Sequence, residues 1–203
     1  MTGTKFDNKT LHWLLSIHIM RVIAGSAKGH RLKAPKRTAT RPATDLVKGA
    51  IFSMLENSTD NWENVLDLYS GSGGLGIEAL SRGAGWVDFV DHAPQCCAII
   101  KENLEKTRFS GLARVHCCTV NKAITFLDKE YDIILIDPPY PDMSIGDTIT
   151  QLAGTKLIGP DTTVVVTHSP RNPLSDQYLS LKMIKEHRHG DSCISVYRKE
   201  DAA

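Results

Sequence analysis

The chain has 203 residues, of which 41% are hydrophobic and 23% charged, and its formal net charge is +1 at pH 7. This length and apolar content suit one α/β domain with a small appendage and exclude the disordered and fibrous classes. The five cysteines are an odd number and lack the CxxC spacing of a zinc site, which indicates reduced thiols in a cytoplasmic protein without a metal. The apolar stretch at 11–20 is too short to span a bilayer, so no membrane role is expected.

The small net charge conceals a strong asymmetry. Residues 21–48 carry eight Lys and Arg against one acidic residue, whereas the rest of the chain is acidic on balance. Localised positive charge is typical of a surface that binds a polyanion, although short basic loops are also often only solvated surface. Charge therefore predicts a candidate polyanion-binding segment without identifying the polyanion.

The basic region begins with two short β-favouring runs, residues 21–25 and 30–35, which predict a hairpin with its turn near Gly29. A polar connector follows at 38–45. From Asp45, a candidate N-cap, apolar residues at helical spacing predict a helix with one face in the core. That face is expected to contain Leu46 or Val47, Ala50, Ile51, Met54 and Leu55.

The body of the chain alternates between strand and helix patterns. Strands are predicted at 64–70, 86–92, 113–119, 131–137 and 162–168, and helices at 73–83, 94–111, 121–129 and 149–158. Two further runs, 180–188 and 192–198, predict a closing antiparallel pair. This alternation predicts a doubly wound α/β fold, in which helices cover both faces of a mostly parallel sheet.

In such a sheet, ligands bind beyond the carboxyl ends of the strands. The first strand ends near Asp67 and continues into YSGSGGLG, where Gly71, Gly73 and Gly76 match GxGxxG between a strand and a helix. Asp91 ends the second strand, twenty positions after Gly71. Glycines allow close backbone approach, the helix N-terminus offers amide donors, and an acid can bind ribose hydroxyls. The pattern predicts a nucleotide-like ligand but does not say which one.

The fourth strand ends in DPPY at 137–140, and this motif discriminates between ligands. A dehydrogenase has no use for it, whereas methyl transfer to an exocyclic amine does. The carboxylate of Asp137 and the carbonyl of Pro138 would hold the amine hydrogens and favour its nucleophilic geometry, and Tyr140 offers a ring on which a base can stack. Each piece alone also fits an ordinary turn, but its combination with the glycine loop and Asp91 favours the catalytic interpretation.

Several segments together resemble the RsmD-type 16S ribosomal RNA guanine-N2 methyltransferases. They are RVIAGSAKGHRLKAP (21–35) with RPATD (41–45), DLYSGSGGLGIEALSRGA (67–84), IDPPY (136–140) and HGDSCISVYR (189–198). The resemblance implies a Rossmann-like class I methyltransferase with a seven-stranded sheet, an antiparallel C-terminal strand and an N-terminal β-hairpin. It also implies S-adenosylmethionine as the methyl donor and a guanine of 16S rRNA, in the small ribosomal subunit, as the target.

The same resemblance implies three groups of site residues. The catalytic group is Asp137, Pro138 and Tyr140. The donor-binding group is Asp67, Tyr69, Gly71, Gly73, Asp91, His92 and Asn121, the last being one place away from the adenine-contacting position of the family. The RNA-binding group is Arg21, Lys28, Arg31, Lys33, Arg37 and Arg41. The implied division is a non-family extension at 1–19, a basic RNA-binding hairpin at 20–45 and a methyltransferase domain at 46–203.

Two positions depart from the family pattern. Gly49 stands where relatives usually have Glu, and Thr167 replaces an acid at the end of a later strand. These departures leave open a non-catalytic RNA-binding protein on the same fold. A DNA adenine-N6 methyltransferase is a second alternative because it also acts on an exocyclic amine, although the chain has little room for a target-recognition region. His116 and His168 are not expected to act as ligands or bases.

Overall fold

The computed structural model describes residues 20–35, 45–139 and 143–200. Its centre is an eight-stranded sheet with the order β3-β2-β1-β4-β5-β8-β7-β6. The strands are β1 (Asn64–Leu68), β2 (Trp86–Asp91), β3 (Ala113–Cys117), β4 (Tyr131–Ile136), β5 (Ile158–His168), β6 (Gln177–Tyr178), β7 (Leu181–His189) and β8 (Ser192–Lys199). The helices are α2 (Asp45–Glu56), α3 (Gly74–Ser81), α4 (Pro94–Thr107), η1 (Ser110–Leu112), α5 (Val120–Phe126) and α6 (Ile145–Ala153).

The first five strands of the chain pair in parallel, and the C-terminal strands add to them in antiparallel orientation. The central parallel strands β1 and β4 are mostly apolar and buried because helices cover both of their faces. The predicted fold class is confirmed, and the two-residue strand β6 adds an eighth member at the edge. The helix predicted at 149–158 is α6, which ends earlier because Gly154 follows it and Ile158 already pairs with Tyr131.

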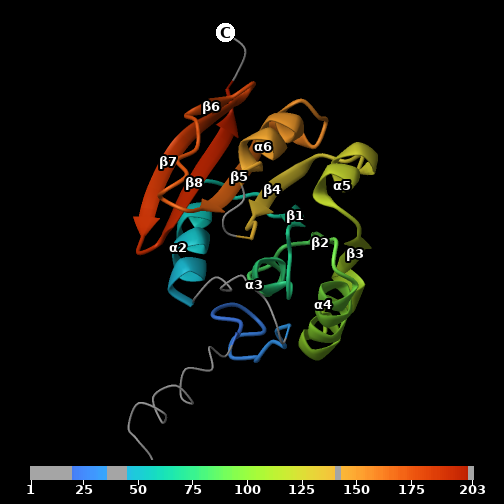
Figure 1. Cartoon of the computed structure of the whole chain (residues 1–203). Coiled ribbons are helices and arrows are strands. Elements are labelled where there is room, and N and C mark those ends of the chain that lie inside the picture. The colour runs from blue at the N-terminus through green and yellow to red at the C-terminus, as the bar shows by residue number, and fades with distance from the viewer. Residues whose placement is uncertain (1–19, 36–44, 140–142, 201–203) are drawn as a thin grey trace, which may run out of the picture.

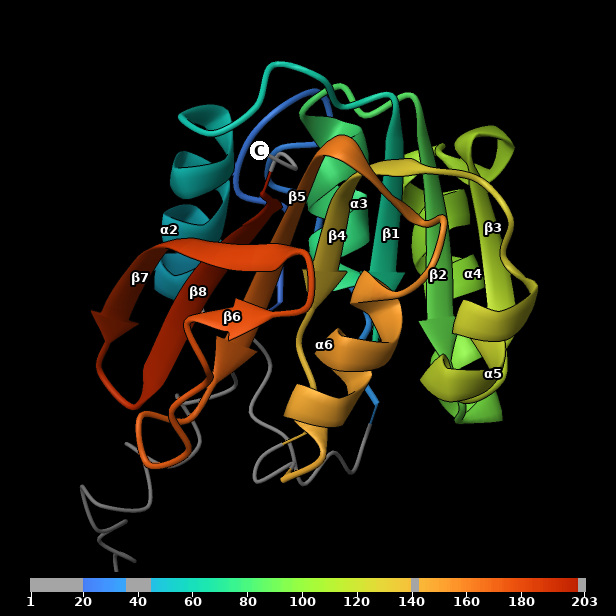
Figure 2. The same ribbon diagram turned by 90° about the horizontal axis from the view of Figure 1, so that it is seen from above.

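Two hydrophobic layers enclose the sheet, as Figure 2 shows from above. One layer lies between the sheet and α2, α3 and α4, and it takes Val65, Phe89 and Leu135 from neighbouring strands. The other lies between the sheet and α5 and α6, and it takes Leu66 and Ile134. Alternate residues of each strand therefore point to opposite layers. No helix in the described part of the chain is long and apolar enough to cross a membrane.

The predicted N-terminal hairpin is less regular than expected. Residues 20–35 fold back on themselves, but they share only one isolated antiparallel bridge, between Arg21 and Arg31. The reason is that the backbone beyond this bridge binds α3 instead: Ile23 and Ala24 donate their amides to the carboxylate of Glu78, at 2.8 and 2.9 Å. The segment therefore lies along α3 (Figure 1) rather than forming a free ladder.

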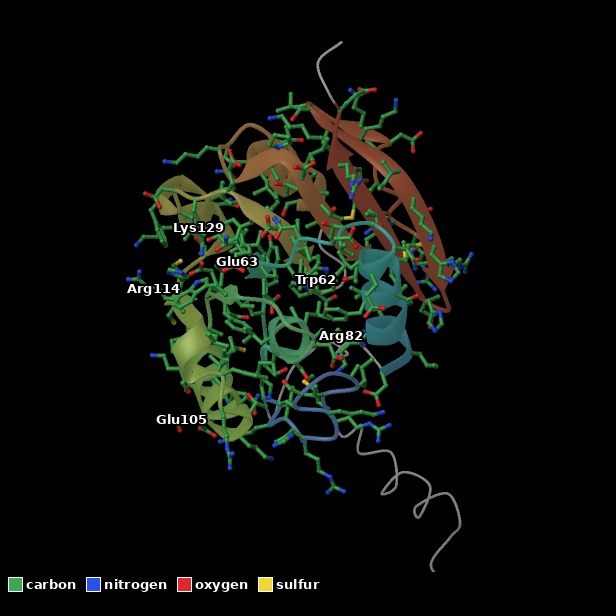
Figure 3. The ribbon with its side chains drawn as sticks, turned by 180° about the vertical axis from the view of Figure 1, so that it is seen from behind. Trp62, Glu63, Arg82, Glu105, Arg114 and Lys129 are labelled. Atoms are coloured by element: carbon green, nitrogen blue, oxygen red, sulfur yellow. The ribbon has the colours of Figure 1, made fainter. Side chains whose placement is uncertain are left out.

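The core face of α2 is the predicted one, with Val47 rather than Leu46 on it. Val47, Ile51, Met54 and Leu55 are buried as expected, but Leu46 is 71% exposed. Lys48 is instead buried at 2% exposure; it donates to the carbonyl of Arg21 and lies 3.7 Å from Glu78. Arg82 also pairs with Glu78, and Figure 3 shows it between α3 and α2. Charge pairing with α3 therefore buries a lysine, beside the predicted apolar face, that hydrophobic spacing does not predict.

Candidate active site

Three carboxylates end three neighbouring strands at one edge of the sheet. Asp67 lies near the end of β1, Asp91 ends β2, and Asp137 directly follows β4. Because β1 is paired with both β2 and β4, the parallel strands bring these side chains to the same edge. This edge is the place at which ligands bind in doubly wound folds.

The turn between β1 and α3 needs glycine for two different reasons. Gly73, which precedes α3, has a φ of +79°, a left-handed conformation that L side chains rarely adopt. Gly76 needs space rather than unusual dihedrals, because a Cβ there would lie 2.3 Å from the ring of Phe89 and 2.9 Å from Asp67 Oδ2. The predicted glycine loop is therefore a tight strand-to-helix turn that is packed directly against Asp67.

Asp67 is a buried carboxylate with few partners. Its Oδ2 accepts the amide hydrogen of Gly76 at 2.9 Å. The pKa of Asp67 is raised to about 8, chiefly by burial and in part by the charges of Asp137 and Asp91, although the Gly76 hydrogen bond lowers it. The carboxyl edge is therefore a region where negative charge is costly in the absence of a positively charged ligand.

Asp91 connects the glycine turn to the start of α4. Its Oδ2 accepts from the amide of Gly71 and its Oδ1 from the amide of Ala93, both at 2.8 Å. These bonds hold the carboxylate at the mouth of the turn, where it remains partly available to a ligand hydroxyl. His92 is exposed beside it, with Nδ1 at 3.9 Å from Asp91 Oδ1.

Asp137 extends the β4 ladder by one residue beyond its end. Its amide lies 3.5 Å from the carbonyl oxygen of Leu68, and Pro138 behind it is buried. Its carboxylate accepts a hydrogen bond from the hydroxyl of Thr167, at the end of β5. Burial raises the pKa of Asp137, whereas the bond from Thr167 lowers it. The carboxylate is thus held between two strand ends.

The remaining residues that were predicted to bind the methyl donor lie farther from the three carboxylates. Tyr69 has a φ of +59° in the turn, and its hydroxyl lies 3.3 Å from the hydroxyl of Thr148 on α6. Asn121 is exposed in the first turn of α5, next to the outer strand β3. Tyr140, Arg37 and Arg41 lie outside the described residues.

The basic residues of the N-terminal segment divide into two places. Lys28 is at the turn of the segment, which binds Ser81 at the C-terminal end of α3, away from the glycine turn. Lys33 is at the opposite end and forms a 2.5 Å ion pair with Glu102, while Arg21 pairs with Asp45 at 2.8 Å. Arg31 is exposed next to Arg21 across the bridge. The structure therefore places Arg21, Arg31 and Lys33 nearer to the carboxyl edge than Lys28.

Two buried polar residues that the sequence analysis did not single out hold this segment in place. Asn103 on α4 accepts from the amide of Lys33 at 2.8 Å and donates to the carbonyls of Lys33 and Ser72, both at 2.9 Å. Glu78 on α3 anchors the segment as described above. The sequence does contain a signal for both residues, because Glu78 and Asn103 are polar residues on helices whose neighbouring positions are apolar. Through Asn103, the basic segment is connected directly to the glycine turn.

No group of three or more His, Cys, Asp or Glu within the described ranges is arranged to hold a metal ion. The groups that the edge offers to a ligand are its carboxylates, the glycine turn and the backbone around them. This arrangement can bind a cationic, ribose-containing ligand beside two hydrogen-bond acceptors at the end of β4, the carboxylate of Asp137 and the carbonyl of Pro138.

Comparison with known proteins finds relatives that span nearly the whole chain. The model of a family described as "Conserved hypothetical protein 95" matches residues 20–198. A relative from Bacillus subtilis (strain 168) called "Putative rRNA methyltransferase YlbH" is 35% identical over 183 residues, which are 89% of this chain and 99% of the relative. "Ribosomal RNA small subunit methyltransferase D" of Escherichia coli (strain K12) is 27% identical over 184 residues, with 89% and 90% of the two chains covered.

Solved structures agree with the sequence relatives. The structure called "Putative methyltransferase yhhF from Escherichia coli" has a TM-score of 0.78 and 26% identity, and the match covers 91% of this chain and 99% of that chain. The matched residues include the basic segment, the glycine turn and the strand that leads to DPPY. The chain therefore belongs to the family described as Conserved hypothetical protein 95, the RsmD-type family that its motifs resemble.

Proposed function

We propose that this protein is an rRNA methyltransferase that transfers a methyl group from S-adenosylmethionine to the N2 amine of a guanine in 16S rRNA. Relatives that are named as rRNA methyltransferases support the broader activity. The proposal for the amine and the donor depends chiefly on one observation, the convergence of Asp137 and Asp67 beside the glycine turn. The site would work in the cytoplasm, on the small ribosomal subunit or its precursor.

The carboxylates of the edge suit a positively charged donor. Within the described residues, Asp67 and Asp137 have hydrogen bonds from an amide and a hydroxyl but no ion pair with a Lys, Arg or His. S-adenosylmethionine carries a sulfonium and an ammonium group, which would offset these buried negative charges. When bound, it supplies the activated methyl group. Asp67, Tyr69, Gly71 and Gly73 would hold its methionine side, Asp91 and His92 its ribose, and Asn121 the region of its adenine.

The end of β4 would orient the acceptor amine. The lone pair of an amine on a nucleobase is delocalised into the ring, which makes the amine a poor nucleophile. The Asp137 carboxylate and the Pro138 carbonyl would each accept one amine hydrogen and so favour a geometry in which the lone pair faces the methyl group. Asp137 must be ionised for this role, because a protonated carboxyl group would have lost acceptor capacity. The ring of Tyr140 would stack on the target base.

The basic segment at 20–45 would bind the RNA backbone, and residues 46–203 would form the methyltransferase domain. Exposed Arg21, Arg31 and Lys33 lie toward the carboxyl edge and would contact phosphates near the target. Lys28, Arg37 and Arg41 would extend this contact. Such phosphate contacts position the RNA but do not select the guanine, which depends on RNA shape and base extrusion.

The test is methyl transfer from labelled S-adenosylmethionine to three substrates, namely 16S rRNA, assembled small subunits and duplex DNA, followed by nucleoside analysis. N2-methylguanosine in either RNA substrate is the expected product. N6-methyladenine in DNA would instead indicate the alternative amine. No transfer to any substrate, together with retained binding to small subunits, would favour a non-catalytic RNA-binding protein.

A further inference from the structure

The hydroxyl of Thr167 lies next to the carboxylate of Asp137. Thr167 lies one residue beyond Val166, which is paired with Ile136 on β4, so it stands directly across from Asp137. Its side chain is almost fully buried, and its hydroxyl donates a hydrogen bond to Asp137 Oδ1. On its other side, Thr167 is paired with Ile194 of β8. The position of this hydroxyl is therefore determined by strand pairing on both sides.

We propose that Thr167 is a positioning residue that keeps the Asp137 carboxylate ionised and turned so that Oδ2 is left to accept the amine hydrogen. The inference rests on the proposed function, because it assigns Asp137 to the amine. A hydroxyl has a single hydrogen to donate, and here that hydrogen satisfies one of the two carboxylate oxygens. Threonine is also stiff at χ1, since its Cβ is branched, so the carboxylate is held in one orientation.

The electrostatic surroundings make this one hydrogen bond important. Burial raises the pKa of Asp137, and the hydrogen bond from Thr167 acts in the opposite direction because it stabilises the charged form. On β1, the neighbouring Asp67 has a pKa that burial raises, and the charges of Asp137 and of Asp91 from β2 raise it as well. The acidic neighbour of Asp137 therefore supplies no positive charge that would stabilise its carboxylate.

Two basic residues in the protein interior, Lys48 and His168, have other partners. Lys48, on α2, is bound to the carbonyl of Arg21 and to Glu78. His168 follows Thr167 on β5, but its Nε2 is 2.8 Å from the hydroxyl of Ser195 and 3.4 Å from Glu186 Oε2. Its Nδ1 lies 3.1 Å from the carbonyl oxygen of Asn172. Within the described residues, the hydroxyl of Thr167 is thus the group from β5 that favours the ionised form of Asp137.

The first test measures ionisation without any substrate. The Asp137 carboxyl carbon is titrated by NMR in ¹³C-aspartate-labelled wild-type protein and in the Thr167→Val, Thr167→Ser and Thr163→Val variants. Thr167→Val is expected to raise the pKa of Asp137, whereas Thr167→Ser should restore it to near the wild-type value. Thr163→Val is a matched control, because Thr163 is buried on the same strand four places earlier and its Oγ1 accepts from Arg198 Nε.

The second test measures the pH profile of methyl transfer. We expect Thr167→Val to lower the transfer rate by about 10-fold near neutral pH, a loss typical of one hydrogen bond to a charged group, with recovery as the pH rises. Thr167→Ser should keep most of the rate. In an Asp137→Asn background, Thr167→Val should cause little further loss, because the carboxylate on which it acts is absent.

The two tests separate this inference from the proposed function. A rate that falls equally at every pH, or an unchanged Asp137 titration in folded Thr167→Val, would overturn the role of Thr167. If wild-type protein transfers no methyl group, the proposed function fails, while the NMR titration still decides whether Thr167 controls the ionisation of Asp137. If Thr167→Val does not fold, Thr167→Ser is titrated against wild type instead. Because serine keeps the hydroxyl, both the pKa of Asp137 and the methyl-transfer rate must then remain at the wild-type values.

Discussion

Two regions of the sheet bury carboxylates in opposite ways. In the interior of β2, Asp88 accepts from His116 Nε2 at 2.8 Å and from Trp86 Nε1 and the Tyr131 hydroxyl at 3.0 Å. It also pairs with Lys129 Nζ at 3.0 Å. Figure 3 shows Lys129 near Glu63, which precedes β1 at the amino ends of the strands. At the carboxyl ends, the partners of Asp67 and Asp137 among the described residues are an amide and a hydroxyl.

The pKa values follow this difference in partners. Burial raises the pKa of Asp88, but the bonds from His116, Lys129 and Tyr131 outweigh it and lower the value to about 2. Burial raises the pKa of Asp67 to about 8 because no cation offsets it. A buried carboxylate with a full set of partners contributes to stability, whereas one that lacks a cation is ready to bind one. The partners of the first region fit a structural role, and for the second we propose a binding role.

The largest expected effect comes from removing the acceptor at the carboxyl edge. Replacing Asp137 with Ala should lower methyl transfer by about 100- to 1000-fold, the usual loss for a group that stabilises developing charge. Donor affinity, measured by calorimetry, should change little because Asp91 and the glycine turn remain. Asp128→Ala, at an exposed position that precedes β4 and is therefore at its other end, serves as the control. Persistent transfer in Asp137→Ala would contradict the role assigned to Asp137.

Removing the structural carboxylate should affect stability rather than chemistry. Asp88→Ala leaves several buried donors without an acceptor and should lower the free energy of unfolding by about 3 kcal/mol, with a Tm roughly 6–12 °C lower. Transfer per folded molecule should be unchanged, and exposed Asp60→Ala provides the control.

The pH dependence of unfolding gives a second check on Asp88. Because its pKa is lowered to about 2 in the folded protein, its contribution is fully present above the ordinary aspartate value and is lost as the pH falls through about 2. The difference in stability between wild type and Asp88→Ala should therefore shrink on acidification below about pH 4. A constant difference from pH 7 to pH 2 would contradict this account.

Asp67→Asn should increase the stability of the protein and weaken donor binding. The folded protein without donor prefers protonated Asp67, so the stability of wild type should fall as the pH rises from about 4 through about 8. The amide lacks this dependence, so the variant should have the higher Tm at pH 8, by about 2–4 °C if the gain is about 1 kcal/mol. Donor binding should be strongly weakened. A variant that is less stable than wild type at pH 8 would argue that Asp67 is not under electrostatic strain.

The smallest effect is expected at Gly49, which lies in α2 outside both regions. A Cβ at this position would meet only the Ile23 side chain, at 3.9 Å, which is ordinary van der Waals contact. Gly49→Ala should therefore stabilise the protein by about 1 kcal/mol through helix propensity, with unchanged transfer. Differential scanning calorimetry and the transfer assay measure both quantities, and a loss of activity would show that this backbone position matters to the site.

Much of the carboxyl edge could be predicted from local pattern. The alternation of strands and helices predicts the doubly wound fold, and the positions of Asp67, Asp91 and Asp137 at strand ends follow from that alternation. The glycine turn was predicted as well, although the crowding of Gly76 against Phe89 depends on packing that a motif does not contain. The irregular N-terminal hairpin and the burial of Lys48 beside the predicted face of α2 were not predicted, because both depend on contacts with Glu78.

By itself, the sequence determined the architecture and the candidate residues of the edge, because periodicity and strand-end position are local properties of the chain. Only the tertiary structure decided how each buried charge is compensated. The pairing of Asp137 with Thr167 joins residues thirty positions apart, and the pairing of Lys48 with Glu78 joins two helices. Partners that distant in sequence are chosen by packing, and in a protein interior the partners decide whether a carboxylate stabilises the fold or is left for a ligand.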